Sequence, residues 1–418
     1  MKAVAPWILA STLVACSAQV ASEGSNADES QQVTDVAPTH VSVSPIDETT
    51  MHVDWRNQSK TGSVAIEWRL VGQKPWTIAA TLESKVGSPL PTSYVLTLVK
   101  PCAIVEVRAV SRQKAKTYPS KAASLSPSKN RMWIWPSVDG DLTIPSVRAA
   151  MIAWATSHNV DTLYVSAYQI LNVNNDPITL ATFVNEAYLS GIGIVLAYGD
   201  PVWSDPAHWA SAHSKIQTAV DFIRQQGAFV STGLPSSQRL GIVIDSEAWV
   251  SNWQGGVWST VASDWLTMLS DLRTVTHGSA TTNPNQLRFA VAIPSWLDTS
   301  TTSCPPGPGC SVTWNAQVKL LSDHVIDLAD GTVVMAYTQS ASSIQSRASA
   351  EVARGSLRCK RQDVGIETAC PVDASSFCGL TQTTMNAAMT SVRTGFSGQY
   401  GFGGIAIDRY GSWSAMSP

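Results

Sequence analysis

The chain has 418 residues, with 28 Lys and Arg against 31 Asp and Glu and a formal net charge of -3. Its 44% hydrophobic and 14% charged content is that of a globular protein long enough for two domains, and excludes a largely disordered chain. The near-neutral charge without a basic stripe argues against nucleic-acid binding. Tryptophan is the outlier, with 16 Trp against 7 Phe, and such an excess suits both core filling and stacking on sugar rings.

The amino end carries a short apolar run, residues 3–15, after a single Lys2. The run is too short to span a bilayer and has the form of a secretory signal. Its end, Leu13-Val14-Ala15-Cys16, resembles a bacterial lipoprotein signal. That resemblance implies a signal peptide over residues 1–15, lipidation of Cys16, and export to the cell envelope, at the outer membrane or cell surface. The alternative is an ordinary signal peptide in which the Cys is accidental.

Residues 16–36 are rich in Ser, Ala, Gln, Glu and Asp, which predicts a flexible tether. Residues 37–127 then alternate short apolar strands with turns, a pattern typical of an all-β sandwich. The clearest strands are 40–43, 51–55, 63–68 and 105–110. The order of Pro38, Trp55 and Tyr94-Val-Leu-Thr-Leu resembles a fibronectin type III module, which serves as a spacer or binding platform and receives no chemistry here.

From 131 to 418 the pattern changes to strand and helix in alternation. Helices are predicted at 146–157, 180–189, 213–226, 257–275 and 342–353. Eight strands match one closed (β/α)8 TIM barrel; the alternative is an open doubly wound sheet, but no glycine-rich phosphate loop follows any strand. The predicted strands are 132–136, 162–166, 192–198, 240–245, 287–293, 332–337, 363–368 and 402–408.

The fourth barrel strand ends in two carboxylates, Asp245 and Glu247, directly before Trp249. Because side chains alternate along a strand, both acids share the inward face, while Ile242 and Ile244 pack against the helices. Active sites of such barrels lie at the carboxyl ends of the strands. Two neighbouring carboxylates raise one pKa, which keeps a carboxylic acid protonated near neutral pH.

This segment resembles the fourth-strand motif Asp-Gly-x-Asp-x-Asp-x-Glu of the chitinase-type family 18 glycoside hydrolases. The resemblance implies that Glu247 is the general acid and that Asp245 assists an acetamido group of the substrate. Met335-Ala-Tyr337 is similar to the family's Met-x-Tyr, which implies that Tyr337 bonds to that acetamido group. Leu240 and Val243 replace the family's first two acids, so the full proton network is absent.

The barrel as a whole resembles uncharacterised bacterial glycoside-hydrolase-like barrels, which imply no particular reaction. The likeness is carried by Tyr198-Gly-Asp-Pro-Val-Trp203, Ile293-Pro-Ser-Trp296, Gly365-Ile-Glu-Thr368 and Gly404-Ile-Ala-Ile-Asp408.

Glu367, on the seventh strand, is a competing acid. If Gly365 faces inward, Glu367 points into the barrel mouth opposite Glu247, an arrangement similar to the large retaining-glycosidase clan. Carboxyl groups about 5–5.5 Å apart suit direct displacement, and about 6.5–9.5 Å suit an inverting water. The alternative is a structural salt bridge from Glu367 to Arg409. Asp408 ends the last strand and either orients a hydroxyl or catalytic partner or closes the barrel.

Aromatic side chains crowd the same strand ends, and about half of them are expected to line a glycan cleft. Asp200, just after the third strand, either binds a hydroxyl or shapes its loop together with Pro201. The predicted substrate-binding residues are Trp133, Trp135, Tyr198, Asp200, Trp203, Trp249, Trp296 and Trp413.

Six cysteines follow Cys16, an even number that suits disulfides in an exported protein. Cys304-Pro-Pro-Gly-Pro-Gly-Cys310 is the clearest pair, because its Pro/Gly loop turns sharply. Cys359, Cys370 and Cys378 lie close together, so one of them pairs elsewhere or stays free. No His lies at zinc-like spacing beside them, and neither a metal nor a cofactor is predicted.

The sequence therefore predicts a lipid-anchored glycoside hydrolase of the cell envelope with a glycan as its partner. Amino-sugar glycans are favoured only through the family resemblance. The alternative is a noncatalytic polysaccharide-binding lipoprotein on a degenerate barrel, because Leu240 and Val243 stand where the family has acids. Membrane contact is expected through the lipid anchor only, and the oligomeric state is not predicted.

Overall fold

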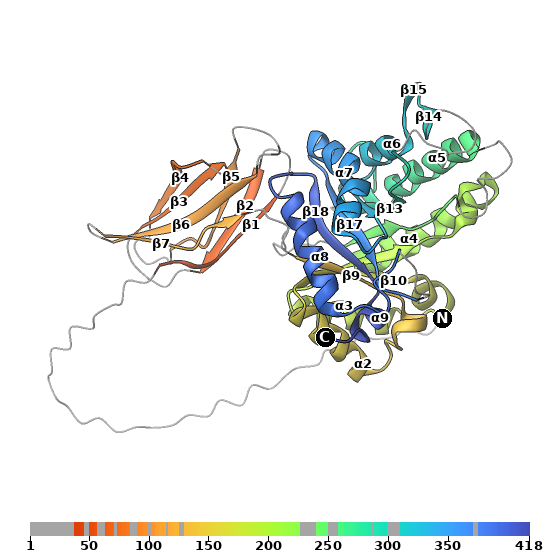
Figure 1. Ribbon diagram of the computed structural model, residues 1–418, viewed down its shortest axis with the longest axis horizontal. Helices are drawn as coiled ribbons and strands as arrows, with labels where there is room; N and C mark the ends of the chain where they lie inside the picture. The colour runs from red at the N-terminus through yellow and green to blue at the C-terminus, as the bar shows by residue number, and fades with distance from the viewer. Residues whose placement is uncertain are drawn as a thin grey trace, which may run out of the picture. The chain divides into compact units, whose positions relative to one another are not determined.

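The computed structural model shows an antiparallel β-sandwich followed by a closed parallel barrel (Figure 1). The structure describes residues 37–45, 50–56, 63–70, 73–83, 90–98, 102, 104–113, 116–124, 129–225, 240–249, 258–285, 287–298, 310–370 and 375–418. The signal peptide, Cys16 and the tether lie outside these ranges, so what the sequence indicates about them stays a prediction. Within them, no helix has the length and apolar character to cross a membrane.

Two antiparallel sheets form the sandwich. One has the order β1-β2-β5, with bounds Thr39–Pro45, Thr50–Arg56 and Ser93–Thr97. The other has the order β4-β3-β6-β7, with β8 also paired to β6, and bounds Thr77–Glu83, Ser63–Leu70, Val105–Gln113, Lys116–Pro119 and Ala123–Ser124. Alternate residues of β2, namely Met51, Val53 and Trp55, are buried against Ile66 and Val107 of the other sheet. The predicted all-β sandwich is confirmed.

Eight parallel strands close into a barrel when β18 pairs with β9. The predicted (β/α)8 fold class is therefore confirmed. In barrel order from β9 the strands are β9 (Asn130–Ile134), β10 (Val160–Ser166), β11 (Gly193–Tyr198), β12 (Gly241–Ile244), β13 (Arg288–Pro294), β16 (Gly331–Met335), β17 (Arg361–Glu367) and β18 (Phe402–Asp408).

Helices follow the barrel strands, and several begin at recognisable signals. The Asp176 side chain caps α3 by accepting from the Thr179 amide at 3.1 Å, with Pro177 in the first turn. The helices are α1 (Pro136–Asp139), α2 (Pro145–Ser157), α3 (Pro177–Leu189), α4 (Trp209–Gln225), α5 (Trp258–His277), α6 (Leu321–Leu328), α7 (Ala341–Arg358), α8 (Gln382–Gly395) and α9 (Tyr410–Ser414).

Several elements of the barrel region were not predicted: the helices α1, α6, α8 and α9, and a hairpin of β14 (Ser311–Trp314) and β15 (Gln317–Leu320). Helix α8 is rich in Thr, Ser and Asn and buries only Met385, Met389 and Val392, so its sequence has a weak apolar period. The hairpin strands are too short to show alternation.

Side chains alternate between the inside of the barrel and a layer beneath the helices. Val243 faces inward, whereas Ile242 and Ile244 pack in the outer core, as the period of two predicts. The inward cluster is dominated by small residues and comprises Trp133, Tyr164, Val195, Ala197, Val243, Ala290, Ala292, Val333 and Ala406.

Disulfides join Cys370 to Cys378, with 5.4 Å between Cα atoms, and Cys359 to Cys102, with 5.2 Å. Cys359 is thus the member of its group that pairs elsewhere. Cys310 is also disulfide-bonded, but Cys304 lies outside the described residues, so their pairing stays a prediction. Disulfides persist in oxidising compartments, which indicates an extracytoplasmic protein.

Candidate active site

Asp245 and Glu247 follow β12 at the carboxyl end of the barrel. Between them, Ser246 is buried and its hydroxyl accepts from the Trp265 indole of α5 at 2.7 Å. Because Ser246 is held on the helix side, the two acids on either side of it point toward the barrel mouth. Glu247 has a positive φ of 33°, a conformation that side chains other than glycine rarely adopt.

A close approach of two loops fixes the backbone of Asp245. Its amide donates to the Tyr198 carbonyl at the end of β11 at 2.8 Å. A side chain at the next residue, Gly199, would place its Cβ 1.8 Å from the Asp245 carbonyl oxygen, so only glycine fits there. Gly199, which follows β11, therefore allows the close approach that positions Asp245 at the end of the adjacent strand β12.

Both carboxyl groups of this pair have raised pKa values. Burial, the Glu247 carboxylate and the Asp408 carboxylate together raise the pKa of Asp245 to about 8. Burial and Asp408 likewise raise the pKa of Glu247. Within the described residues, Asp245 Oδ1 is buried and has no hydrogen-bond partner, so no local donor stabilises its ionised form. The pair is suited to holding a proton near neutral pH.

Glu367 and Asp408 form a second carboxyl pair at the ends of β17 and β18. They are register partners on adjacent parallel strands, so their side chains leave the same face side by side. Burial and the Asp408 charge raise the pKa of Glu367 to about 8. Val364 and Ile366 pack in the outer core, so the other side of β17, which carries Gly365 and Glu367, faces inward. This is the orientation in which Glu367 points into the barrel mouth.

Tyr337 is subject to the charges of all four acids. After burial, the charges of Asp408, Glu367, Asp245 and Glu247 raise its pKa well above the usual value. A Cβ at Gly365 would stand 3.3 Å from the Tyr337 ring, so this glycine leaves the ring its space. The structure thus brings together all five residues predicted as catalytic, and each is partly exposed.

The charge balance at the mouth is unusual. Within the described ranges, the four carboxyl groups form no ion pair with Lys, Arg or His, whereas Asp139 and Asp363, whose side chains are fully buried, both pair with arginine. Arg409 pairs with Asp139 at 2.7 Å, so the alternative of a Glu367–Arg409 salt bridge is wrong. Groups of three or more His, Cys, Asp or Glu with a geometry for a metal ion do not occur in the described part of the chain.

The aromatic residues predicted to bind substrate separate into two groups. Trp133 and Trp135 are stacked with ring centroids 5.7 Å apart and planes 3° apart, and the partly exposed Trp135 donates its indole N–H to Asp408 at 3.0 Å. Trp249 and Trp296 are partly exposed and meet edge to face at 5.9 Å.

The remaining predicted binding residues have other surroundings. Trp203, Trp413 and Tyr198 are buried, at 2%, 1% and 2% exposure, and pack in the outer core, so they offer no open face to a sugar. Asp200 accepts from the Val202 amide at 3.1 Å and begins a short 3-10 helix, which is the loop-shaping arrangement that its Pro201 suggested.

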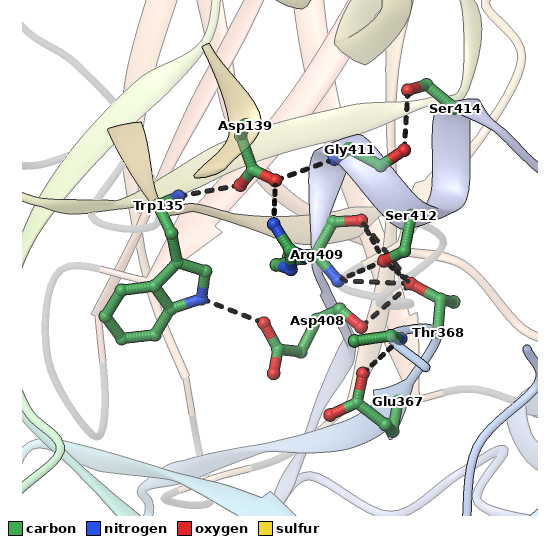
Figure 2. A network of polar contacts seen from close by, with 10 residues as sticks. Trp135, Asp139, Glu367, Thr368, Asp408, Arg409, Gly411, Ser412 and Ser414 are labelled. Atoms are coloured by element: carbon green, nitrogen blue, oxygen red, sulfur yellow. Dashed lines mark hydrogen bonds and ion pairs between the residues drawn. The ribbon is translucent and has the colours of Figure 1, made fainter. Parts of the chain in front are cut away.

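Sequence reasoning missed Asp139 and gave Arg409 a different partner. Asp139 is fully buried and accepts from the Trp135 amide, the Arg409 guanidinium and the Gly411 amide at 2.7, 2.7 and 3.0 Å (Figure 2). This carboxylate ties the loop after β9 to the loop after β18. The only signal in the sequence was the Asp139-Gly-Asp141 triplet, which gave no partner.

The chain matches no family model and no curated protein. Solved structures similar to part of it contain fibronectin type III domains. They include a domain of human collagen XX (14% identity, 22% of this chain, 91% of that chain, TM-score 0.19), an Fn3-like protein from Clostridium thermocellum (17%, 22%, 90%, 0.19) and the FN5 domain of Drosophila Lar (13%, 22%, 92%, 0.18). The chain spans 30% of the length of a structure of titin domains that it also resembles.

Proposed function

We propose that this protein is a glycoside hydrolase of the cell envelope, anchored through Cys16. The observation that carries the proposal is the gathering of four carboxyl groups and Tyr337 at the end of a TIM barrel where active sites lie, with no ion pair to these carboxyl groups among the described residues. A carboxylic acid that keeps its proton near neutral pH is the group that acid-catalysed glycoside cleavage needs.

Glu247 is the proposed proton donor to the leaving oxygen, and Asp245 is its electrostatic partner. Because the pKa of Asp245 is raised to about 8, its carboxyl group holds a proton in the resting site and shares it with Glu247 two residues further on. Ionisation of either group raises the cost of ionising the other, so Glu247, after it has given its proton to the leaving oxygen, takes a proton from the water that completes hydrolysis.

The other mouth residues support this step. Tyr337 lies between the two carboxyl pairs and orients the substrate through its hydroxyl group. Glu367 and Asp408 supply carboxyl groups from the opposite strands, and the partly exposed Trp135, stacked on the buried Trp133, presents an apolar surface to a sugar ring. Polysaccharides or oligosaccharides near the envelope are the proposed substrates, with amino-sugar glycans favoured by the resemblance to family 18.

The decisive variant is Glu247→Gln, which keeps the side-chain size but carries no transferable proton. We expect it to retain glycan binding and folding and to lose hydrolysis by at least about 100-fold, measured on a glycan panel with mass detection of products. Glu83→Gln, at an exposed position of β4, is the matched control and keeps full activity. Undiminished hydrolysis by Glu247→Gln excludes it as the donor.

A noncatalytic glycan-binding protein is the second candidate. It is favoured by Leu240 and Val243, both buried apolar residues where family 18 has acids. The same panel separates the two functions, because a binding protein retains a glycan in a pull-down or calorimetric titration but releases no product from any member of the panel.

A further inference from the structure

The ends of β9, β17 and β18 meet around Asp408 (Figure 2). The Trp135 indole N–H donates to Asp408 Oδ1 at 3.0 Å. Asp408 is the register partner of Glu367 on the adjacent parallel strand, so the two side chains leave the same face side by side. Two neighbouring carboxyl groups repel each other when both are ionised, so such a pair holds one proton between its members.

The neighbours of the pair differ on its two sides. Asp408 accepts from a side-chain donor, the Trp135 indole, and the positive charge of Arg409 acts on it. Glu367 accepts from the amide of Ala369 in its own loop through Oε1, so its Oε2 atom is the one that would carry a proton. The arrangement with a protonated Glu367 and an ionised Asp408 satisfies every one of these contacts.

We propose that Trp135 is the positioning residue of this pair: its indole N–H holds Asp408 as the carboxylate and thereby leaves the shared proton on Glu367. Trp135 thus has a role beyond the sugar stacking that its sequence position suggested. Its catalytic meaning rests on the proposed function, because it makes Glu367 the acid and Asp408 the base of the second pair.

Trp135 is held in place independently of the pair. Its backbone amide donates to Asp139 at 2.7 Å, and Asp139 is bound in turn to Arg409 and the Gly411 amide. Its ring is stacked on Trp133. The donor therefore cannot turn away from Asp408 without breaking contacts on two sides, which is what a positioning residue requires.

The titration of the pair is subject to the groups that face it from the neighbouring strand ends and loops. Each of them acts on the pair directly or through Tyr337, so a change in the charge of any of them would also shift the pKa values of the pair. These groups are Asp139, Asp245, Glu247, Tyr337 and Arg409.

The test uses the full chain labelled with carboxyl-13C glutamate, and follows the Glu367 resonance, assigned by Glu367→Gln, in a pH titration by NMR. In the wild type we expect Glu367 to lose its proton near pH 8. In Trp135→Phe the Asp408 carboxylate loses a donor. The midpoint then rises by about one pH unit, and the resonance below the midpoint moves toward the ionised form as the proton passes to Asp408.

Trp133→Phe is the matched control, because it shortens the stacked partner but removes no donor from Asp408. It should leave the Glu367 titration unchanged. An unaltered titration in Trp135→Phe, or an equal change in Trp133→Phe, overturns the proposal. If circular dichroism shows that Trp135→Phe is unfolded, Asp408→Asn replaces it: the Glu367 midpoint must fall once the neighbouring charge is gone, and a constant midpoint overturns the shared proton.

The measurement needs no turnover, so it separates this inference from the proposed function. Absence of hydrolysis on the glycan panel, with the expected shift in Trp135→Phe, rejects the enzyme and keeps the positioning role. Hydrolysis by the wild type, together with an unaltered titration of Glu367 in Trp135→Phe, keeps the enzyme and rejects the positioning role.

Discussion

Arg131 and Asp363 form an ion pair inside the barrel, with 3.2 Å between Nε and Oδ1, that joins β9 to β17. Arg288 lies 3.4 Å from the other carboxylate oxygen, and the Tyr164 hydroxyl donates to it. Glu367 lies four residues further along the same strand, about 13 Å away by the rise of a strand. The fold thus neutralises one carboxylate in the barrel interior, whereas the carboxyl groups at the mouth form no ion pair with any described residue, which distinguishes the candidate site from the structural network below it.

Because Asp363 is bound to Arg131, Arg288 and Tyr164 inside the barrel, we expect Asp363→Asn to lose much of its stability. The change leaves two buried guanidinium groups without their counter-charge, and breaking a buried pair in this way costs about 3–5 kcal/mol of unfolding free energy. Urea denaturation measures it. Asp221→Asn, at an exposed position of α4, is the control and should stay within about 0.5 kcal/mol of the wild type. A similarly small change in Asp363→Asn contradicts the prediction.

The period of two predicted which strand residues face the barrel interior. Val243, Asp245 and Glu247 share one face because successive side chains of a strand point to opposite sides, and the same rule placed Glu367 and Asp408. The carboxyl ends of parallel strands meet at one end of the barrel, so the four acids and Tyr337 could be grouped from the sequence alone.

The partners of these residues could not be predicted in the same way. Asp139 and Arg409 are 270 positions apart, and a strand pattern gives the face of a residue but not its contact across the barrel. The Trp pattern was only partly informative for a similar reason. Trp203 and Trp413 lie at strand ends like Trp135, but loop packing buries them, and packing of that kind depends on tertiary contacts.

The Cys370–Cys378 disulfide is predicted to hold the end of β17. Phe377 donates its amide to the Glu367 carbonyl at 2.8 Å, and the Ser376 hydroxyl donates to the Ala369 carbonyl at 2.6 Å. Opening a loop of this size costs about 2–3 kcal/mol by chain entropy. The double variant Cys370→Ser/Cys378→Ser should therefore unfold at lower urea and lose hydrolysis while it is still folded.

Thermal unfolding with and without a reductant checks that expectation. The wild type should move toward the double variant when it is reduced, whereas the double variant should respond only through its other disulfide bonds. Equal stability of the oxidised wild type and the double variant would show that the bond does not constrain this loop.

Because of Glu351, we expect the unfolding free energy to fall as the pH rises. It is 1% exposed on α7, neither carboxyl oxygen has a hydrogen-bond partner within the described residues, and burial followed by the Asp298 and Asp323 charges raises its pKa to about 9. The folded state holds this proton more tightly than the unfolded chain, so the unfolding free energy falls as pH rises from about 4.5 to about 9.

Glu351→Gln removes that proton equilibrium and keeps the shape of the side chain. We expect the variant to be more stable than the wild type by about 1–2 kcal/mol at pH 8, and equal to it at pH 4, in urea denaturation at both values. Glu83→Gln should show no such difference. A constant gap between variant and wild type at the two pH values would reject the buried acid as its cause.

Asp245→Asn tests the pH dependence of the candidate site. The raised pKa of about 8 means that Asp245 keeps its proton through neutral pH, so hydrolysis that draws on this proton falls as the pH rises through about 8. The amide of the variant cannot supply a proton, and hydrolysis should fall by about 100-fold or more at every pH. The pH profile of hydrolysis measures both effects.

The same variant has the opposite effect on stability. Because the folded pKa of Asp245 lies above its ordinary value of 3.8, the wild type loses unfolding free energy between that value and about 8, and Asp245→Asn does not. The variant should therefore be less active and more stable than the wild type at pH 8. A variant that loses both activity and stability would assign Asp245 to the structural core of the barrel, because a residue kept for catalysis alone strains the fold and does not support it.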